Sequence, residues 1–240
     1  LPDTLIDFNS IDSKPLEFQT ALVAPPKVVK AGLPKLKRDV SLGILEFSED
    51  QGLPGYRVTA MMQDSHGMLW IATDKGLCRF NGEYLEIYTF IEAVFTGSIA
   101  EVSSMLEDQK GRIWIYSQGG IYILDHVTGL VAKIKGSANF NNTKCDLLVD
   151  HRGLIWQGTA QDGLFIIDPE QETLRHVAQL HKDDAGNTKK LIEDEEGNIW
   201  VGSPTGLSIV NYETGKVRYL DDQNGLPANQ VKGLFQDRNN

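Results

Sequence analysis

The sequence is poor in cysteine and has no long apolar run, and both shortages limit what the protein can be. Two cysteines, Cys78 and Cys145, cannot form a disulfide framework, and we expect both to be buried thiols. Apolar stretches such as residues 163–167 fall far short of the roughly 20 residues that a membrane-spanning helix requires. The first residues also lack the basic start and apolar run of a signal peptide. The sequence therefore predicts membrane attachment only through segments outside this chain, and so far it leaves cytoplasm and periplasm both open.

Basic residues are also scarce relative to acidic ones. The chain has 23 Lys and Arg against 33 Asp and Glu, a formal net charge of −10 at pH 7. Because phosphate contacts need a concentrated basic face, this balance excludes a nucleic-acid-binding protein. The 41% of hydrophobic residues is enough for a sizeable core, so we expect a folded, soluble chain.

Motifs of catalysis and metal binding are missing as well. No serine lies in a Gly-x-Ser-x-Gly elbow, and the acidic segment 193–196 is typical of a solvated turn. The five histidines show no metal-ligand spacing such as His-x-x-x-His: His66, His126, His151, His176 and His181. We predict no enzyme, no catalytic residue, no metal site and no cofactor in this region.

What the sequence does contain is one motif, Asp-x-x-Gly-x-hydrophobic-Trp, in four copies. The tryptophans are 44, 42 and 44 residues apart, a period typical of propeller blades. The motif residues are Asp64, Gly67 and Trp70; Asp108, Gly111 and Trp114; Asp150, Gly153 and Trp156; and Asp194, Gly197 and Trp200. We interpret all twelve as structural repeat residues.

The motif has a mechanical interpretation as a turn between two strands. Asp at the first position can accept hydrogen bonds from the amides ahead of it, and Gly at the fourth position permits the exit of the chain. A second glycine six or seven residues after each Trp begins a third strand, and another turn leads to a fourth. Four antiparallel strands joined by tight turns make one propeller blade.

Both faces of these strands are apolar, as in Leu-Trp-Ile-Ala at 69–72, so each sheet needs cover on two sides. Stacking of blades supplies that cover, with each indole as filler between blades. The sequence therefore predicts an all-β chain, a β-propeller of four complete four-stranded blades plus a partial fifth. The complete repeats span about 58–100, 101–143, 144–187 and 188–229, and the partial blade spans 41–57 and 230–240.

The two ends of the repeat region allow two interpretations. Residues 42–47 match a fourth strand, and residues 231–240 restart the repeat, with Asp237 placed 43 residues after Asp194. The end strands could share one sheet and close a ring. We favour a fragment of a larger propeller, since such a sheet would lack its second and third strands; its exposed strand edges predict self-association.

Residues 1–40 carry no repeat. They contain Pro25-Pro26 and a basic run formed by Lys27, Lys30, Lys35, Lys37 and Arg38. This composition predicts an extended N-terminal arm or linker. It could dock on an acidic partner, but a solvated linker lying over the propeller is the interpretation we favour.

The repeats resemble the two-component regulator propeller family, whose consensus is D-x-x-G-x-I-W-I-G-T followed by G-L. The chain reads DEEGNIWVGS at 194–203 and DHRGLIWQGT at 150–159, and the resemblance extends over residues 41–240. The second repeat departs from it, with Ile115-Tyr116-Ser117 where a small residue is usual. The resemblance implies a periplasmic or extracytoplasmic sensor domain, often attached to a histidine kinase, and implies glycans as candidate ligands.

We therefore expect a sensing or binding module of a bacterial two-component-type receptor. Two alternatives stay open: a protein-interaction or dimerisation scaffold without a small ligand, and a lyase-like propeller enzyme. Propellers bind at one mouth of the channel, through loops that enter the first strand and loops between the second and third strands. The polar residues of these loops are the predicted ligand contacts: Tyr56, Arg57, Asp74, Lys75, Gln118, Gln161 and Asp162.

Overall fold

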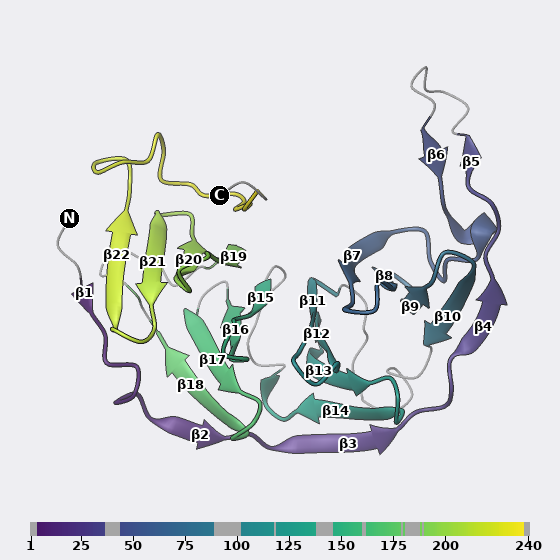
Figure 1. The fold of residues 1–240 in the computed structure, drawn as a ribbon, viewed down its shortest axis with the longest axis horizontal. Helices are drawn as coiled ribbons and strands as arrows, with labels where there is room; N and C mark the ends of the chain where they lie inside the picture. Colours follow the sequence, from purple (N-terminus) through teal and green to yellow (C-terminus); the bar gives the residue numbers. More distant parts are fainter. Residues whose placement is uncertain are drawn as a thin grey trace. The chain divides into compact units, whose positions relative to one another are not determined.

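The computed structural model describes residues 4–36, 44–88, 102–117, 119–137, 146–159, 162–178, 180, 188 and 190–237. These residues form four five-stranded antiparallel sheets and one two-stranded sheet (Figure 1). The 3-10 turn η1 (Glu49–Gln51) precedes the first repeat, and none of the described residues forms a helix long and apolar enough to cross a membrane. The chain divides into two compact units, Gln19–Lys133 and Leu1–Phe18 with Ile134–Asn240.

The first two sheets belong to the unit Gln19–Lys133. The first sheet has the order β4 (Lys27–Lys30), β10 (Tyr84–Tyr88), β9 (Gly76–Phe80), β8 (Leu69–Thr73) and β7 (Val58–Gln63). The second has the order β11 (Ser104–Glu107), β12 (Ile113–Ser117), β13 (Gly120–Asp125), β14 (Leu130–Ile134) and β3 (Phe18–Leu22). A separate pair, β5 (Lys35–Leu36) with β6 (Leu45–Glu46), completes this unit.

The third and fourth sheets belong to the other unit. The third has the order β15 (Asp146–Val149), β16 (Ile155–Gly158), β17 (Leu164–Asp168), β18 (Thr173–Val177) and β2 (Ser13–Pro15). The fourth has the order β19 (Lys190–Glu193), β20 (Ile199–Gly202), β21 (Leu207–Asn211), β22 (Lys216–Leu220) and β1 (Thr4–Leu5). In all four sheets, consecutive strands of one repeat are neighbours, because tight turns join them.

The Asp-x-x-Gly segments form the turns between the first and second strands. In the first repeat, Asp64 Oδ1 accepts hydrogen bonds from the amides of His66 (3.0 Å) and Met68 (2.9 Å). Gly67 follows with φ +79°, a left-handed conformation that favours glycine. The other three repeats show the same pair of bonds and a positive φ at the same glycine.

The N-terminal segment supplies the fifth strand of each of the four five-stranded sheets (purple in Figure 1). β4 pairs with β10, β3 lies next to β14, β2 pairs with β18, and β1 pairs with β22. Within a unit, Phe8 is only 2% exposed and anchors the segment in the core. Strands of residues 1–40 therefore cover sheet edges that would otherwise leave backbone groups unpaired.

The tryptophan of one repeat packs against the sheet of the next within each unit. Trp70 shares a buried cluster with Ile115 and Leu124 of the second sheet. Trp156 shares another with Val201 and Val210 of the fourth sheet. The large indole surface is therefore removed from water between two sheets rather than at the surface.

The opposite face of the first sheet is covered by the segment that precedes its repeat. Leu53 and Phe47 pack there against Ile71, Cys78 and Leu85. Within the segment that the sequence assigned to a partial blade, β6 pairs with β5 in the two-stranded sheet. At the other end, described residues 230–237 form no strand.

Candidate functional site

Each motif aspartate joins the turn to the tryptophan of its own repeat. Its second carboxylate oxygen accepts a hydrogen bond from the indole Nε1 six residues later. The four distances are 3.0 Å for Asp64–Trp70, 2.8 Å for Asp108–Trp114, 2.8 Å for Asp150–Trp156 and 2.7 Å for Asp194–Trp200. Sequence reasoning assigned the aspartate to the turn and the indole to packing, and it missed this bond although the six-residue spacing was visible.

A cation completes the network in three of the four repeats. Asp64 pairs with Arg79 (2.8 Å), Asp108 with Arg112 (2.7 Å) and Asp150 with Arg152 (2.5 Å). In the fourth repeat the corresponding donor is the neutral amide of Asn198, 3.0 Å from Asp194.

The electrostatics of Asp64 show why this carboxylate stays ionised. Burial alone raises the pKa of Asp64, but hydrogen bonds from the Met68 amide, the Trp70 indole and Arg79 outweigh it and hold the pKa below 3.8. An ionised carboxylate with all acceptors engaged is a structural group rather than an acid or a base. We therefore assign the network to stability.

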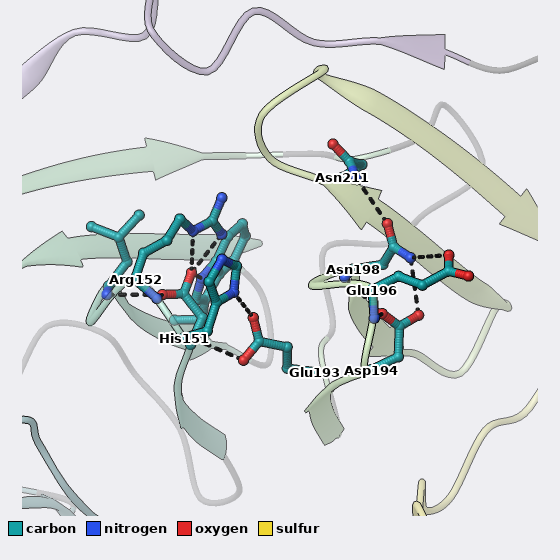
Figure 2. Close-up of polar contacts among 10 residues, drawn as sticks. His151, Arg152, Glu193, Asp194, Glu196, Asn198 and Asn211 are labelled. Atoms are coloured by element: carbon teal, nitrogen blue, oxygen red, sulfur yellow. Dashed lines mark hydrogen bonds and ion pairs between the residues drawn. The ribbon is translucent and has the colours of Figure 1, made fainter. Parts of the chain in front are cut away.

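Two glutamates each hold the turn of the preceding repeat, and Figure 2 shows one of them, Glu193, beside His151. Glu193 accepts a bond from the His151 amide (2.9 Å) and contacts His151 Nδ1 at 2.5 Å. Glu107 accepts bonds from the amide (2.6 Å) and the hydroxyl (3.0 Å) of Ser65. The prediction of a solvated turn is wrong for Glu193, whose side chain is only 17% exposed. The signal that could have identified it is the Glu-Asp dipeptide at the same repeat position, 107–108 and 193–194.

The structure brings four of the predicted ligand contacts together on the first repeat. The Arg57 amide donates to Asp74 Oδ1 (3.1 Å), and the Asp74 amide donates to the Arg57 carbonyl (3.0 Å). Lys75 Nζ lies 5.9 Å from the centroid of the Tyr56 ring, which is 73% exposed.

Glu49 belongs to the same cluster and was missed by sequence reasoning. Its Oε1 lies 2.8 Å from Lys75 Nζ, and this bond raises the pKa of Lys75. Glu49 begins η1, which precedes the repeat, so no repeat position drew attention to it. We call Glu49, Tyr56, Arg57, Asp74 and Lys75 the Tyr56 cluster.

The remaining predicted contacts do not join this cluster in what the structure describes. Gln118 and Gln161 lie outside the described residues. Asp162 is exposed in the turn between β16 and β17, where its amide donates to the Thr159 hydroxyl (2.9 Å) and its carbonyl lies 2.6 Å from His176 Nε2.

The loops between second and third strands owe their shape to a hydroxyl at their start. In the first repeat the Thr73 hydroxyl donates to the Gly76 carbonyl (3.0 Å) and accepts from the Lys75 amide (3.2 Å). Thr159 and Ser203 donate in the same way to Gly163 and Gly206. This recurring bond accounts for Ser or Thr at these positions without a ligand.

Metal binding and thiol chemistry find no support in the described ranges. These residues contain no group of three or more His, Cys, Asp and Glu that could hold a metal ion. Burial raises the pKa of the Cys78 thiol to about 12, so it stays protonated and unreactive at neutral pH. Cys145 lies outside the described residues.

One segment of the chain matches a known protein family. Residues 52–75 match the family described as two component regulator propeller. The chain is similar to this family over that segment, which begins before β7 and ends after β8. The resemblance inferred from the Asp-x-x-Gly-x-Ile-Trp pattern is therefore confirmed.

Among curated proteins, histidine kinase P4 of Formosa agariphila is 25% identical over 180 residues, which cover 70% of this chain and 13% of the kinase. Among solved structures, the extracellular domain of the putative hybrid two component system BT3049 from B. thetaiotaomicron is 22% identical, with a TM-score of 0.64. That match covers 81% of this chain and 28% of BT3049. The chain thus spans less than a third of the length of either of these two proteins.

A propeller of another class has a similar fold. Virginiamycin B lyase from Staphylococcus aureus is 10% identical, with a TM-score of 0.58, over 85% of this chain and 74% of the lyase. At this identity the likeness shows the fold alone, and no lyase activity follows from it. The predicted all-β propeller fold is confirmed.

Proposed function

We propose that this chain is part of an extracytoplasmic sensor propeller that binds a small ligand and passes a rearrangement to an attached signalling module. A glycan is the ligand class we favour. The match at residues 52–75 carries the proposal, because that segment contains Tyr56, Arg57, Asp74 and Lys75. The similarity to a histidine kinase and to the extracellular domain of a hybrid two component system supports the cellular role.

The chemistry of the Tyr56 cluster suits a sugar. An exposed aromatic ring offers a flat apolar face on which the C–H groups of a pyranose can stack. Lys75 and Glu49 offer a donor and an acceptor beside that ring; they lie 2.8 Å apart and both are exposed. The hydrogen bonds from the Arg57 amide to the Asp74 carboxylate and from the Asp74 amide to the Arg57 carbonyl fix the loop, so little ordering entropy is lost on binding.

A thermal-shift screen against oligosaccharides tests this site. We expect one or more sugars to raise the Tm of the wild-type chain, and Tyr56→Ala to remove most of that shift. Lys75→Ala should weaken the affinity for the sugar about threefold to tenfold, through loss of one charged hydrogen bond. Lys30→Ala is the matched control, since Lys30 forms a comparable exposed ion pair with Glu83 at 3.4 Å. A sugar-induced shift that survives Tyr56→Ala would refute this location of the site.

The second candidate is a self-association scaffold, and the β5–β6 pair favours it. Leu36 and Leu45 are cross-strand partners and are 66% and 62% exposed. Leu33 and Ile44 beside them are 86% and 47% exposed. A two-stranded sheet with an uncovered apolar face is marginal in water, so a second copy of the chain would stabilise it.

Light scattering after gel filtration separates the two candidates. If the scaffold function holds, the wild-type mass rises with concentration, and Leu36→Asn with Leu45→Asn abolishes the rise. The paired control is Leu22→Asn, since Leu22 is 75% exposed but lies on β3. A mass that stays monomeric at every concentration removes the scaffold and leaves the sensor proposal untouched.

A further inference from the structure

One fully buried side chain of the third sheet is polar. Gln157 on β16 is 0% exposed, and neither its Nε2 nor its Oε1 has a hydrogen-bond partner in the part of the chain that the structure describes. Its cross-strand neighbours are Leu147 on β15 and Phe165 on β17, which are 7% and 6% exposed. A buried amide without partners raises the free energy of the folded state, because it loses the hydrogen bonds that water supplies. Gln157 therefore favours any state in which water reaches it.

The position of Gln157 is aliphatic in the other three repeats. The residues that follow the motif tryptophan there are Ile71, Ile115 and Val201. Ile115 lies in the buried cluster that contains Trp70, and Val201 lies in the cluster that contains Trp156. In both units the residue after a tryptophan thus packs with the tryptophan of the preceding repeat. The third repeat has an amide at this contact position.

A second contact position is also changed in the third repeat. Glu107 and Glu193 stand directly before the motif aspartate of their repeats. They accept hydrogen bonds from the turn of the preceding repeat, at Ser65 and His151. The third repeat has Val149 at this position, and a valine side chain cannot accept a hydrogen bond.

The third contact position carries an aromatic ring in the second and fourth repeats. The His126 ring lies edge-on to Trp70, and the Tyr212 ring lies edge-on to Trp156, both with 5.8 Å between centroids. Both residues directly follow the third strand of their repeat, so they hold the same repeat position. The residue that follows β17 is Pro169, which has no aromatic ring. The third repeat has thus lost all three contacts that the second and fourth repeats make with the repeat before them.

The buried amide lies on one defined face of the third sheet. Trp156 packs against the fourth sheet, and successive residues of a strand point to opposite faces, so Gln157 lies on the other face. We propose that the molecule opens at the face of the third sheet that carries Gln157, while the faces between repeats of one unit stay closed. Elements that move are drawn from the least stabilised contacts of a fold, and the open state gives the amide access to water. This opening requires no sugar, so it is independent of the Tyr56 cluster.

Labelling of engineered thiols measures the opening in the free protein. The two native cysteines are replaced by alanine in all variants. Leu147→Cys reports on the face of Gln157, and Leu191→Cys is the matched control, because Leu191 is the cross-strand partner of Val201 and is 4% exposed. A maleimide without denaturant should label Leu147→Cys about fivefold to a hundredfold faster, the factor expected for one unpaired buried polar group.

Gln157→Met tests the cause, since it removes the amide and keeps a side chain of similar length. It should slow the labelling of Leu147→Cys by about fivefold to a hundredfold and leave that of Leu191→Cys unchanged. Hydrogen exchange of the β15 amides should be slower than the labelling, because the face opens without loss of strand pairing. Equal labelling of the two cysteines, a rate that Gln157→Met leaves unchanged, or β15 exchange as fast as the labelling would overturn the proposal.

Discussion

At the scale of single residues, the motif aspartate connects local geometry with the core. One oxygen of Asp150 closes the turn by accepting amide bonds, and the other accepts the Trp156 indole hydrogen and the Arg152 guanidinium. The turn therefore has the right shape only while the indole points into the core. This dependence explains why Asp and Trp recur together at a fixed spacing.

A double-mutant cycle on this pair measures the connection. Asp150→Asn should lower the free energy of unfolding by about 1.5–3 kcal/mol, because the hydrogen bonds lose their charge. Trp156→Phe removes the indole donor and part of the core volume. Urea unfolding of the two single variants and the double variant should give a coupling energy of about 0.5–3 kcal/mol. Strict additivity would mean that the bond contributes nothing.

His126 predicts a pH dependence of stability. Burial, and then the neighbouring Arg79, lowers the pKa of His126 below 6.5, so folding favours its neutral form. The free energy of unfolding is therefore highest above pH 6.5, where His126 is neutral in both states. It decreases as the pH falls, because the unfolded chain then binds a proton that the folded chain resists.

We test this contribution with His126→Tyr, which places the ring found at the equivalent Tyr212 without a group that titrates near neutrality. The free energy of unfolding should fall more steeply for the wild type than for the variant between about pH 7.5 and pH 5.5. Parallel curves would show that the environment of His126 does not resist its protonation.

At the scale of elements, the turns between strands need glycine for two separate reasons, as Gly163 between β16 and β17 and Gly82 between β9 and β10 show. Gly163 has φ +75°, and a side chain there would meet the Val177 and Ala178 carbonyl oxygens. Gly82 has φ +96°, but a side chain there would meet no atom within 4 Å.

Substitution of these two glycines by alanine distinguishes the cost of backbone strain from the cost of a steric clash. Gly82→Ala should cost about 1–2 kcal/mol, the cost of placing an L-residue in the left-handed region. Gly163→Ala should cost about 1–3 kcal/mol more, because the backbone of β18 must move. Chemical denaturation measures both, and equal losses would contradict the close approach at Gly163.

The N-terminal segment is an element that depends on a buried anchor. Phe8 stacks on Tyr212 at 5.1 Å and meets Trp156 edge-on at 6.4 Å. Phe8→Ala should lower the free energy of unfolding by about 3–5 kcal/mol through loss of buried area and a cavity.

Leu5→Ala is the control for that variant, because Leu5 is 72% exposed on β1 of the same segment. Its effect should stay within about 0.5 kcal/mol. If both variants destabilise alike, the segment is held by its backbone pairing and not by the aromatic anchor.

At the scale of the whole molecule, a net charge of −10 opposes contact between copies. Salt weakens this repulsion, since the Debye length falls from about 20 Å to about 6 Å between about 0.02 M and 0.3 M NaCl. If the β5–β6 pair associates, the weight-average mass from sedimentation should therefore rise with salt. Leu36→Asn with Leu45→Asn should remove the rise, and a mass that falls with salt would indicate an ionic interface instead.

The sequence predicted the structural role of a residue correctly where that role depends on neighbours within the same repeat. The turns at Gly67, Gly111, Gly153 and Gly197 and the packing tryptophans follow from a period and from local backbone rules. The contact of Glu193 with His151 could not be predicted in this way, because the two residues are 42 positions apart. The residues around Glu193 have the pattern of a solvated turn. Glu49 was missed because it lies before the first repeat.

The sequence by itself determined the all-β repeat and the order of the four strands within each repeat, because short-range turn chemistry and a fixed period encode them. Only the tertiary structure decided which strand completes each sheet, which carboxylates hold a neighbouring repeat and how deeply the Gln157 amide is buried. These features depend on contacts between residues far apart in the chain, and no local pattern of residues specifies such contacts.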